Sequence, residues 1–167
     1  MPGIVWVADF TYIKFQDRFI YLATVMDLYT REIIGWNISR FHNAELVLGA
    51  FKDALKRNGP KPPKYFHSDQ GSEYDSNSYT GLMLSLNILI SMSKKDSPWE
   101  NGFQESFYSQ FKVDLGEVNR FDSLGELVEA IHQTFYYYNN HRIHTSLKMS
   151  PASFRKSKDK LSKEKGT

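Results

Sequence analysis

The stretch "IVWVADFTYI", residues 4–13, decides the fold. Under the two-residue period of a β-strand, one face is formed by Val5, Val7, Asp9, Thr11 and Ile13. The opposite face is entirely apolar or aromatic. Apolar side chains on both faces indicate a central strand that is covered on both sides. Asp9 is the exception, because a carboxylate in such a strand is costly unless it is paired, hydrogen-bonded or bound to a metal.

Short connections follow this strand. The segments "FQDR" (15–18) and "LYTR" (28–31) separate it from two further apolar runs, so residues 4–39 are expected to form an antiparallel meander. Asn43 is the expected N-cap of the first helix. The remaining pattern predicts a helix at 44–57, strands at 65–68 and 87–92, and helices at 78–86, 100–115, 124–141 and 149–156. This order is typical of a mixed α/β layout without internal repeats.

Composition and charge restrict the possible classes of protein. The 167 residues suit one domain with a sizeable core, no apolar run is long enough for a transmembrane helix, and the absence of cysteine fits an intracellular protein. Six basic and two acidic residues give residues 155–167 a net charge of +4, whereas the whole chain carries +2, so residues 1–154 carry −2. We therefore expect a folded domain over 1–154 and a basic, disordered tail over 155–167. The polar segment 93–102 is expected to be a mobile loop.

A second stretch, "HSDQGSEY" (67–74), places carboxylates at the end of a predicted strand. Asp69 ends that strand, and Gly71 would let the backbone approach a metal or a phosphate closely. Glu73 is interpreted as a solvated residue and His67 as a structural histidine. An isolated Asp at a strand end is structural in most proteins, so this stretch does not identify a site alone.

A third carboxylate, Glu105, lies on a predicted helix after the loop, and 35 residues separate it from Asp69. A helical Glu is usually a surface residue. With this spacing and five ordered motifs, the chain resembles the D-D-E integrases and transposases of ribonuclease-H-like fold, in particular bacterial insertion-sequence transposases. The motifs are "WVADFTYI", "YLATVMDLYTREIIGW", "HSDQGSEY", "PWENGFQESFYSQFK" and "YYYNNHRIHTSLKMSP".

The resemblance implies a ribonuclease-H-like fold with a five-stranded mixed sheet flanked by helices. It also implies a catalytic triad of Asp9, Asp69 and Glu105 that holds Mg²⁺ or Mn²⁺, with two ions expected. Three neighbouring carboxylates repel one another, and a hard divalent cation relieves that repulsion. Two such ions can stabilise the attacking and leaving oxygens of a displacement at phosphorus.

DNA is the implied substrate, through hydrolysis of a phosphodiester at an element end and attack of the freed 3′-OH on target DNA. The resemblance assigns Lys112 to DNA binding. Seven residues after Glu105, it lies on the same helix face about 10 Å away. Asn101 and Arg142 are the other candidate DNA contacts, with Gln104 and Ser106 as weaker ones. Tyr136–Tyr138 are interpreted as core residues, and His144 is not expected to bind zinc.

Two departures from the family pattern bear on function. Glu100-Asn101 stands where many members carry Asp-Asn, and no helix-turn-helix precedes Trp6. Specific recognition of element ends by this chain alone is therefore not expected. A homo-oligomer on DNA, a cytoplasmic bacterial location and no membrane partner are the remaining expectations. The alternatives are a ribonuclease-H-like nuclease without strand transfer and a non-catalytic DNA-binding remnant.

Overall fold

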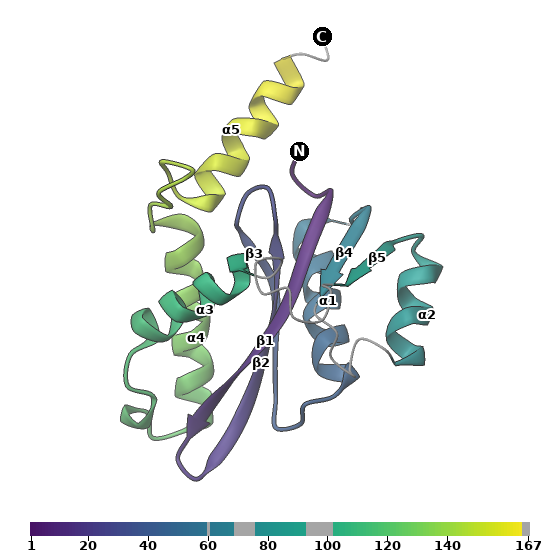
Figure 1. The fold of residues 1–167 in the computed structure, drawn as a ribbon. Coiled ribbons are helices and arrows are strands. Elements are labelled where there is room, and N and C mark those ends of the chain that lie inside the picture. Colours follow the sequence, from purple (N-terminus) through teal and green to yellow (C-terminus); the bar gives the residue numbers. More distant parts are fainter. Residues whose placement is uncertain (60, 69–75, 93–101, 165–167) are drawn as a thin grey trace.

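A five-stranded mixed sheet forms the centre of the computed structural model, which describes residues 1–59, 61–68, 76–92 and 102–164 (Figure 1). The strand order is β3-β2-β1-β4-β5. The strands are β1 (Val5–Phe15), β2 (Arg18–Asp27), β3 (Ile33–Ser39), β4 (Tyr65–Ser68) and β5 (Leu89–Met92). The expected central position of the first strand and the mixed character of the sheet are confirmed.

The first three strands form the predicted antiparallel meander. In the β1–β2 pair, Trp6 lies opposite Asp27 and Phe15 lies opposite Arg18, so only two residues make the turn. Gln16 in that turn has a φ of 51°, a left-handed conformation that tight hairpins require. β4 then joins the other edge of β1 in parallel orientation, with Val7 opposite His67, and β5 pairs in parallel with β4.

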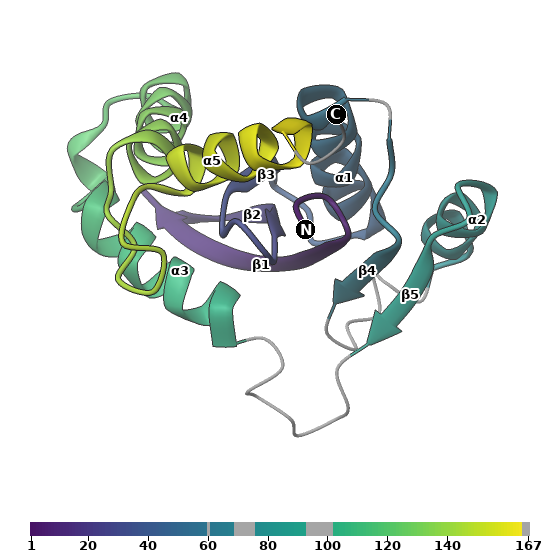
Figure 2. The ribbon, with the colours of Figure 1, turned by 90° about the horizontal axis from the view of Figure 1, so that it is seen from above.

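Helices cover both faces of the sheet, as Figure 2 shows in a view from above. α1 and α2 lie on one side, and α3 and α4 lie on the other. The helices are α1 (Ala44–Asn58), α2 (Asn77–Ser85), α3 (Gly102–Leu115), α4 (Leu124–Asn140) and α5 (Pro151–Glu164), with a 3-10 turn at Val118–Arg120. Asn43 caps α1 by accepting the Leu46 N–H, as expected.

The alternation along β1 divides its side chains between two cores. Trp6 and Ala8 belong to the core under α1 and α2, whereas Ile13 and Phe15 belong to the core under α3 and α4. Successive residues of a strand point to opposite faces. Asp9 is therefore on the same face as Ile13, which is the face that α3 covers.

The final helix is longer than expected. α5 continues from Pro151 to Glu164, so the expectation of a disordered tail is wrong for residues 155–164. The cause is a set of contacts that are distant in sequence. Arg155 forms a 3.0 Å ion pair with Glu32 and a hydrogen bond to Asn58, and the ring centre of Phe154 lies 5.6 Å from that of Tyr29.

The expected mobile loop at 93–102 lies outside the described residues except for Gly102, the first residue of α3. Among the described residues, none of the helices is both long and apolar enough to cross a membrane.

Gly35 on β3 is a position where the backbone of α1 approaches the sheet closely. An added Cβ would lie 2.4 Å from the backbone N of Ala54 and 2.5 Å from the carbonyl oxygen of Ala50. Gly35→Ala is expected to lower the free energy of unfolding by about 1–3 kcal/mol, because helix backbone has to move. Urea denaturation followed by circular dichroism measures this change.

Gly81→Ala is the matched control, because Gly81 lies within α2 and an added Cβ there meets nothing within 4 Å. Alanine is the better helix former, so this variant is expected to gain about 0.5–1 kcal/mol. Equal stabilities for the two variants would show that α1 does not pack against Gly35 as described.

Candidate active site

The first candidate carboxylate, Asp9, lies near the middle of β1 opposite Thr24 of β2. Its side chain is half-buried, and Oδ1 accepts the Phe10 N–H at 2.8 Å. The strand on the other side of β1 is β4, which ends at the fully buried Ser68. Asp9 thus lies on the central strand, two residues beyond Val7, which pairs with His67 at the start of the "HSDQGSEY" motif.

Several predicted site residues lie outside the described part of the chain. They are Asp69, Gly71, Glu73 and Asn101. Their assigned roles stay predictions. His67, at the start of the same motif, is described: its Nδ1 lies 3.1 Å from the Ser91 hydroxyl on β5, which supports its interpretation as a structural histidine.

Glu105 lies in the first turn of α3, and its side chain is exposed. The residues around it alternate between burial and exposure with helical spacing. Gln104, one position earlier, is fully buried, and Phe107 and Tyr108 are buried on the following turn. Glu105 therefore projects from a helix whose opposite side is fixed in the core.

A buried polar network joins this helix to the strand that carries Asp9. The Gln104 amide donates to the Val7 carbonyl at 2.8 Å, and the Tyr108 hydroxyl donates to the Asp9 carbonyl at 2.7 Å. Thr24 of β2 completes the network. Its hydroxyl donates to Gln104 Oε1 at 3.2 Å and lies 2.8 Å from the Tyr108 hydroxyl. Buried networks of this kind define one relative position of the elements that they join.

The role of Gln104 differs from the one expected. A DNA contact is wrong for this residue, because its side chain is fully buried and bonded to β1. A sequence signal for its burial does exist. Gln104 shares the buried face of α3 with aromatic and aliphatic residues at helical spacing, namely Phe107, Tyr108, Phe111 and Leu115.

The predicted basic DNA contacts are exposed or half-buried and lie near α3. Lys112 is exposed, and its Nζ lies 5.5 Å from the ring centre of Tyr12 on β1. Arg142, which follows α4, forms a 2.9 Å ion pair with Asp114 at the end of α3. An ion pair with a carboxylate reduces the charge that Arg142 presents to DNA, so Lys112 has the stronger structural case.

The three consecutive tyrosines of α4 divide between core and surface. Tyr138 is buried, its ring centre lies 4.9 Å from that of Phe107, and burial raises its pKa to about 12. Tyr136 and Tyr137 are 55% and 49% exposed. The expectation of core packing is therefore confirmed for Tyr138 and wrong for its two exposed neighbours.

The described residues contain no group of three His, Cys, Asp or Glu side chains that could hold a metal ion. Asp9 and Glu105 nevertheless offer only carboxylate oxygens, which are the ligands that Mg²⁺ and Mn²⁺ prefer. The donor chemistry of these two residues therefore fits a hard divalent cation, with the third predicted ligand outside the described part.

Tyr108→Phe tests the network that joins α3 to β1. The change removes one hydroxyl and leaves the Asp9 carbonyl and Thr24 without that partner, so we expect a loss of about 1–2 kcal/mol in the free energy of unfolding. Tyr136→Phe is the control, because its side chain is exposed, and it is expected to stay within about 0.5 kcal/mol of the parent. Chemical denaturation of the three proteins compares them; a Tyr108→Phe protein as stable as its control would contradict the network.

Comparison with known proteins adds family relationships to this geometry. A family model described as the integrase core domain matches residues 1–98, and a second model of the same description matches residues 86–151. The transposase for insertion sequence element IS904 from Lactococcus lactis is 35% identical over 157 residues, which cover 93% of this chain and 62% of that protein. An uncharacterized transposase-like protein from Haemophilus influenzae is 34% identical over 92% of this chain and 71% of its own length.

The fold has close counterparts among solved structures. The HTLV-2 integrase catalytic core domain in complex with magnesium, in its trimeric form, superimposes with a TM-score of 0.77. The match covers 92% of this chain and 97% of that chain at 17% sequence identity. The expected ribonuclease-H-like fold is thereby confirmed. The chain spans less than two thirds of the length of the Lactococcus lactis relative.

Proposed function

The chain belongs to the integrase core domain family, and we propose that it is the catalytic core of a DNA transposase. The proposed reaction is metal-dependent hydrolysis of a phosphodiester at an element end, followed by transfer of the freed 3′-OH to target DNA. Asp9, Asp69 and Glu105 are the proposed catalytic residues.

One observation carries this proposal: the hydrogen bonds from Gln104 and Tyr108 to the backbone of β1. They fix the helix that carries Glu105 against the strand that carries Asp9, at Asp9 itself. Asp69 follows Ser68 directly in the chain, and Ser68 ends the strand that pairs with β1. Covalent geometry keeps the Cα atoms of Ser68 and Asp69 about 3.8 Å apart.

Asp9, Asp69 and Glu105 would hold the divalent metal, Mg²⁺ or Mn²⁺, and two ions are proposed. When bound, the metal supplies the positive charge that activates an attacking oxygen and stabilises a leaving oxygen at phosphorus. The carboxylates would determine where that charge lies. The network at Gln104, Thr24 and Tyr108 would keep α3 from moving when charge accumulates beside it.

Contacts to the DNA are proposed for residues around this centre. Lys112 shares a helix face with Glu105 and is exposed, so its ammonium can neutralise a backbone phosphate. Asn101 and Arg142 are proposed as further contacts. Assembly of more than one copy on DNA and a cytoplasmic location are proposed from the bacterial relatives and from the assembled integrase of a solved intasome.

Two alternatives have specific grounds. A nuclease without strand transfer would use the same carboxylates on the same fold. A non-catalytic DNA-binding remnant would have no need for carboxylates on the two elements that the buried network joins.

A joining assay separates the three possibilities. The protein is incubated with a labelled duplex that ends in a free 3′-OH, unlabelled target plasmid and Mg²⁺ or Mn²⁺. Transposase chemistry predicts label joined covalently to the plasmid only when the metal is present. Metal-dependent nicking without joined label would favour the nuclease, and no metal-dependent change in either DNA would favour the remnant.

A further inference from the structure

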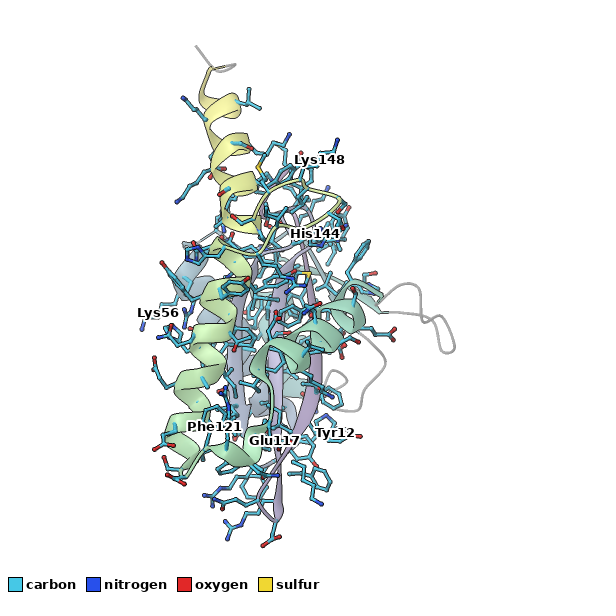
Figure 3. All side chains as sticks on the ribbon, turned by 90° about the vertical axis from the view of Figure 1, so that its left-hand side faces the viewer. Tyr12, Lys56, Glu117, Phe121, His144 and Lys148 are labelled. Atoms are coloured by element: carbon cyan, nitrogen blue, oxygen red, sulfur yellow. The ribbon has the colours of Figure 1, made fainter. Side chains whose placement is uncertain are left out.

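A cleft of about 800 Å³ lies between α3, the β2–β3 turn and the connection from α4 to α5, and none of the three proposed catalytic carboxylates is among its described lining residues. Three basic side chains line it: Arg31, Arg142 and His144. No acidic residue is among its described lining residues. His144 lies in the connection beyond α4, above α3, as Figure 3 shows. The cleft therefore presents positive charge in a chain whose residues 1–154 are slightly acidic overall.

Arg31 contributes a charge that no contact ion pair neutralises in the described part of the chain. Its guanidinium carbon lies 3.5 Å from the ring centre of Phe103 at the start of α3, and its Nη1 is buried without a hydrogen-bond partner. The nearby Asp27 carboxylate accepts N–H bonds from Gly3, Tyr29 and Thr30 instead. Burial lowers the pKa of Arg31, whereas Tyr138 and Asp27 oppose that shift. Arg31 is half-buried, and a buried guanidinium N–H without a hydrogen-bond acceptor is unusual and calls for a partner.

The groups that surround Arg31 indicate that its missing partner is an anion. Burial lowers the pKa of His144, and the charges of Arg31 and Arg142 lower it further. The contribution of the two arginines shows that their charges reach His144. The N-terminus of α3, at Gly102, also borders the cleft and adds the positive end of a helix dipole. Asp114 neutralises the charge of Arg142 alone, through their 2.9 Å ion pair.

We infer that this cleft binds a DNA backbone phosphate at a position away from the scissile bond. The inference rests on the proposed function, because it takes DNA as the substrate. Guanidinium groups match phosphate oxygens in geometry and charge. The exposed apolar side chains at the cleft, Phe103, Val113 and Ile143, suit the sugar and base that accompany a phosphate better than an isolated inorganic ion. A phosphate held beside α3 would orient the duplex relative to Glu105.

The test measures how salt affects DNA affinity. Binding of a fluorescent 20-base-pair duplex of arbitrary sequence is followed by anisotropy over a series of KCl concentrations, without divalent metal. Arg31→Gln is expected to reduce the slope of log K against log salt by about 0.9, which corresponds to one lost phosphate contact. Arg57→Gln is the control, since Arg57 lies in α1 on the other face of the sheet and pairs with Asp53. Its slope is expected to equal that of the parent.

Thr145→Glu provides a second variant that removes no buried contact. Thr145 is exposed and lines the cleft, so a carboxylate there adds negative charge where the phosphate is inferred. It is expected to weaken duplex binding several-fold at low salt. Thr80→Glu, at a half-buried site on α2, controls for the added charge. Thermal melting of each variant confirms that it is folded before binding is measured.

The outcomes separate this inference from the proposed function. A parent that binds the duplex, with unchanged binding in Arg31→Gln and Thr145→Glu, overturns the cleft alone. A parent that binds no duplex overturns the DNA-based function and the cleft together. Poly-glutamate and inorganic phosphate serve as competitors. If either displaces the duplex at the same charge concentration in an Arg31-dependent manner, the cleft is a general anion site and the assignment to DNA is wrong.

Discussion

Asp9→Asn is expected to lower the rate of DNA joining by about 10³-fold or more. Asparagine keeps the size of the side chain and the oxygen that accepts the Phe10 N–H, but it removes the charge. A catalytic metal contributes several kcal/mol to stabilisation of the transition state, and about 4 kcal/mol corresponds to about 10³ in rate. The joining assay with a labelled 3′-OH duplex measures this change. Asp69→Asn is expected to have an equal effect.

The stability of the metal-free protein should not fall together with its activity. Without metal, loss of one carboxylate relieves repulsion, so neither Asn variant should be less stable than the parent. Mg²⁺ should raise the melting temperature of the parent and raise that of the variants much less, because a ligand that binds only the folded state stabilises it. Asp17→Asn, an exposed position in the β1–β2 turn, is the control and should keep parental activity. Joining by Asp9→Asn at the parental rate would exclude Asp9 from the catalytic centre.

Trp6→Ala is expected to cause the largest loss of stability among the core substitutions considered, about 3–5 kcal/mol. Trp6 is fully buried between β1 and α1, with its ring centre 5.9 Å from that of Phe51. Its indole N–H is also buried without a hydrogen-bond partner in the described structure, so its removal offsets part of the loss. We therefore expect a loss of stability near the lower end of that range. This loss is still a large part of the free energy of unfolding of a typical domain, which is about 5–15 kcal/mol.

Trp6→Phe separates the loss of packed volume from the removal of the unpaired indole N–H. Phenylalanine fills most of the volume and removes the unpaired N–H, so the expected loss is below about 1.5 kcal/mol. Urea denaturation monitored by circular dichroism compares both variants with the parent. If the free energy of unfolding of Trp6→Ala lies within about 1 kcal/mol of the parental value, Trp6 does not form the centre of the core between the sheet and α1.

The sequence predicted the parts of the fold that depend on local pattern. The alternation along residues 4–13 identified the central strand because both its faces are buried, and Asn43 identified the start of α1 because its side chain accepts a backbone N–H. The end of α5 was missed because the contacts that stabilise it, such as Arg155 with Glu32, join residues far apart in the chain. Its basic composition resembles that of a solvated tail when read alone.

The candidate site was predictable in its residue types but not in its supporting contacts. Asp9 was conspicuous because a carboxylate interrupts an apolar strand. Gln104 was misassigned because a polar residue beside Glu105 looks like a substrate contact until its partner, the Val7 carbonyl, is known. Arg31 carried no local signal, since its significance comes from Phe103, Arg142 and His144, which lie on other elements.

The proposed metal centre can be tested most directly by a crystal structure of the protein soaked in Mn²⁺, with anomalous diffraction used to locate the metal. The account predicts anomalous density between Asp9 and Asp69, with the three carboxylates of Asp9, Asp69 and Glu105 within roughly 8 Å of one another, because two ions about 3.5–4 Å apart need shared ligands. Manganese bound elsewhere on the chain, with the Asp69 carboxylate turned away from Asp9, would contradict it.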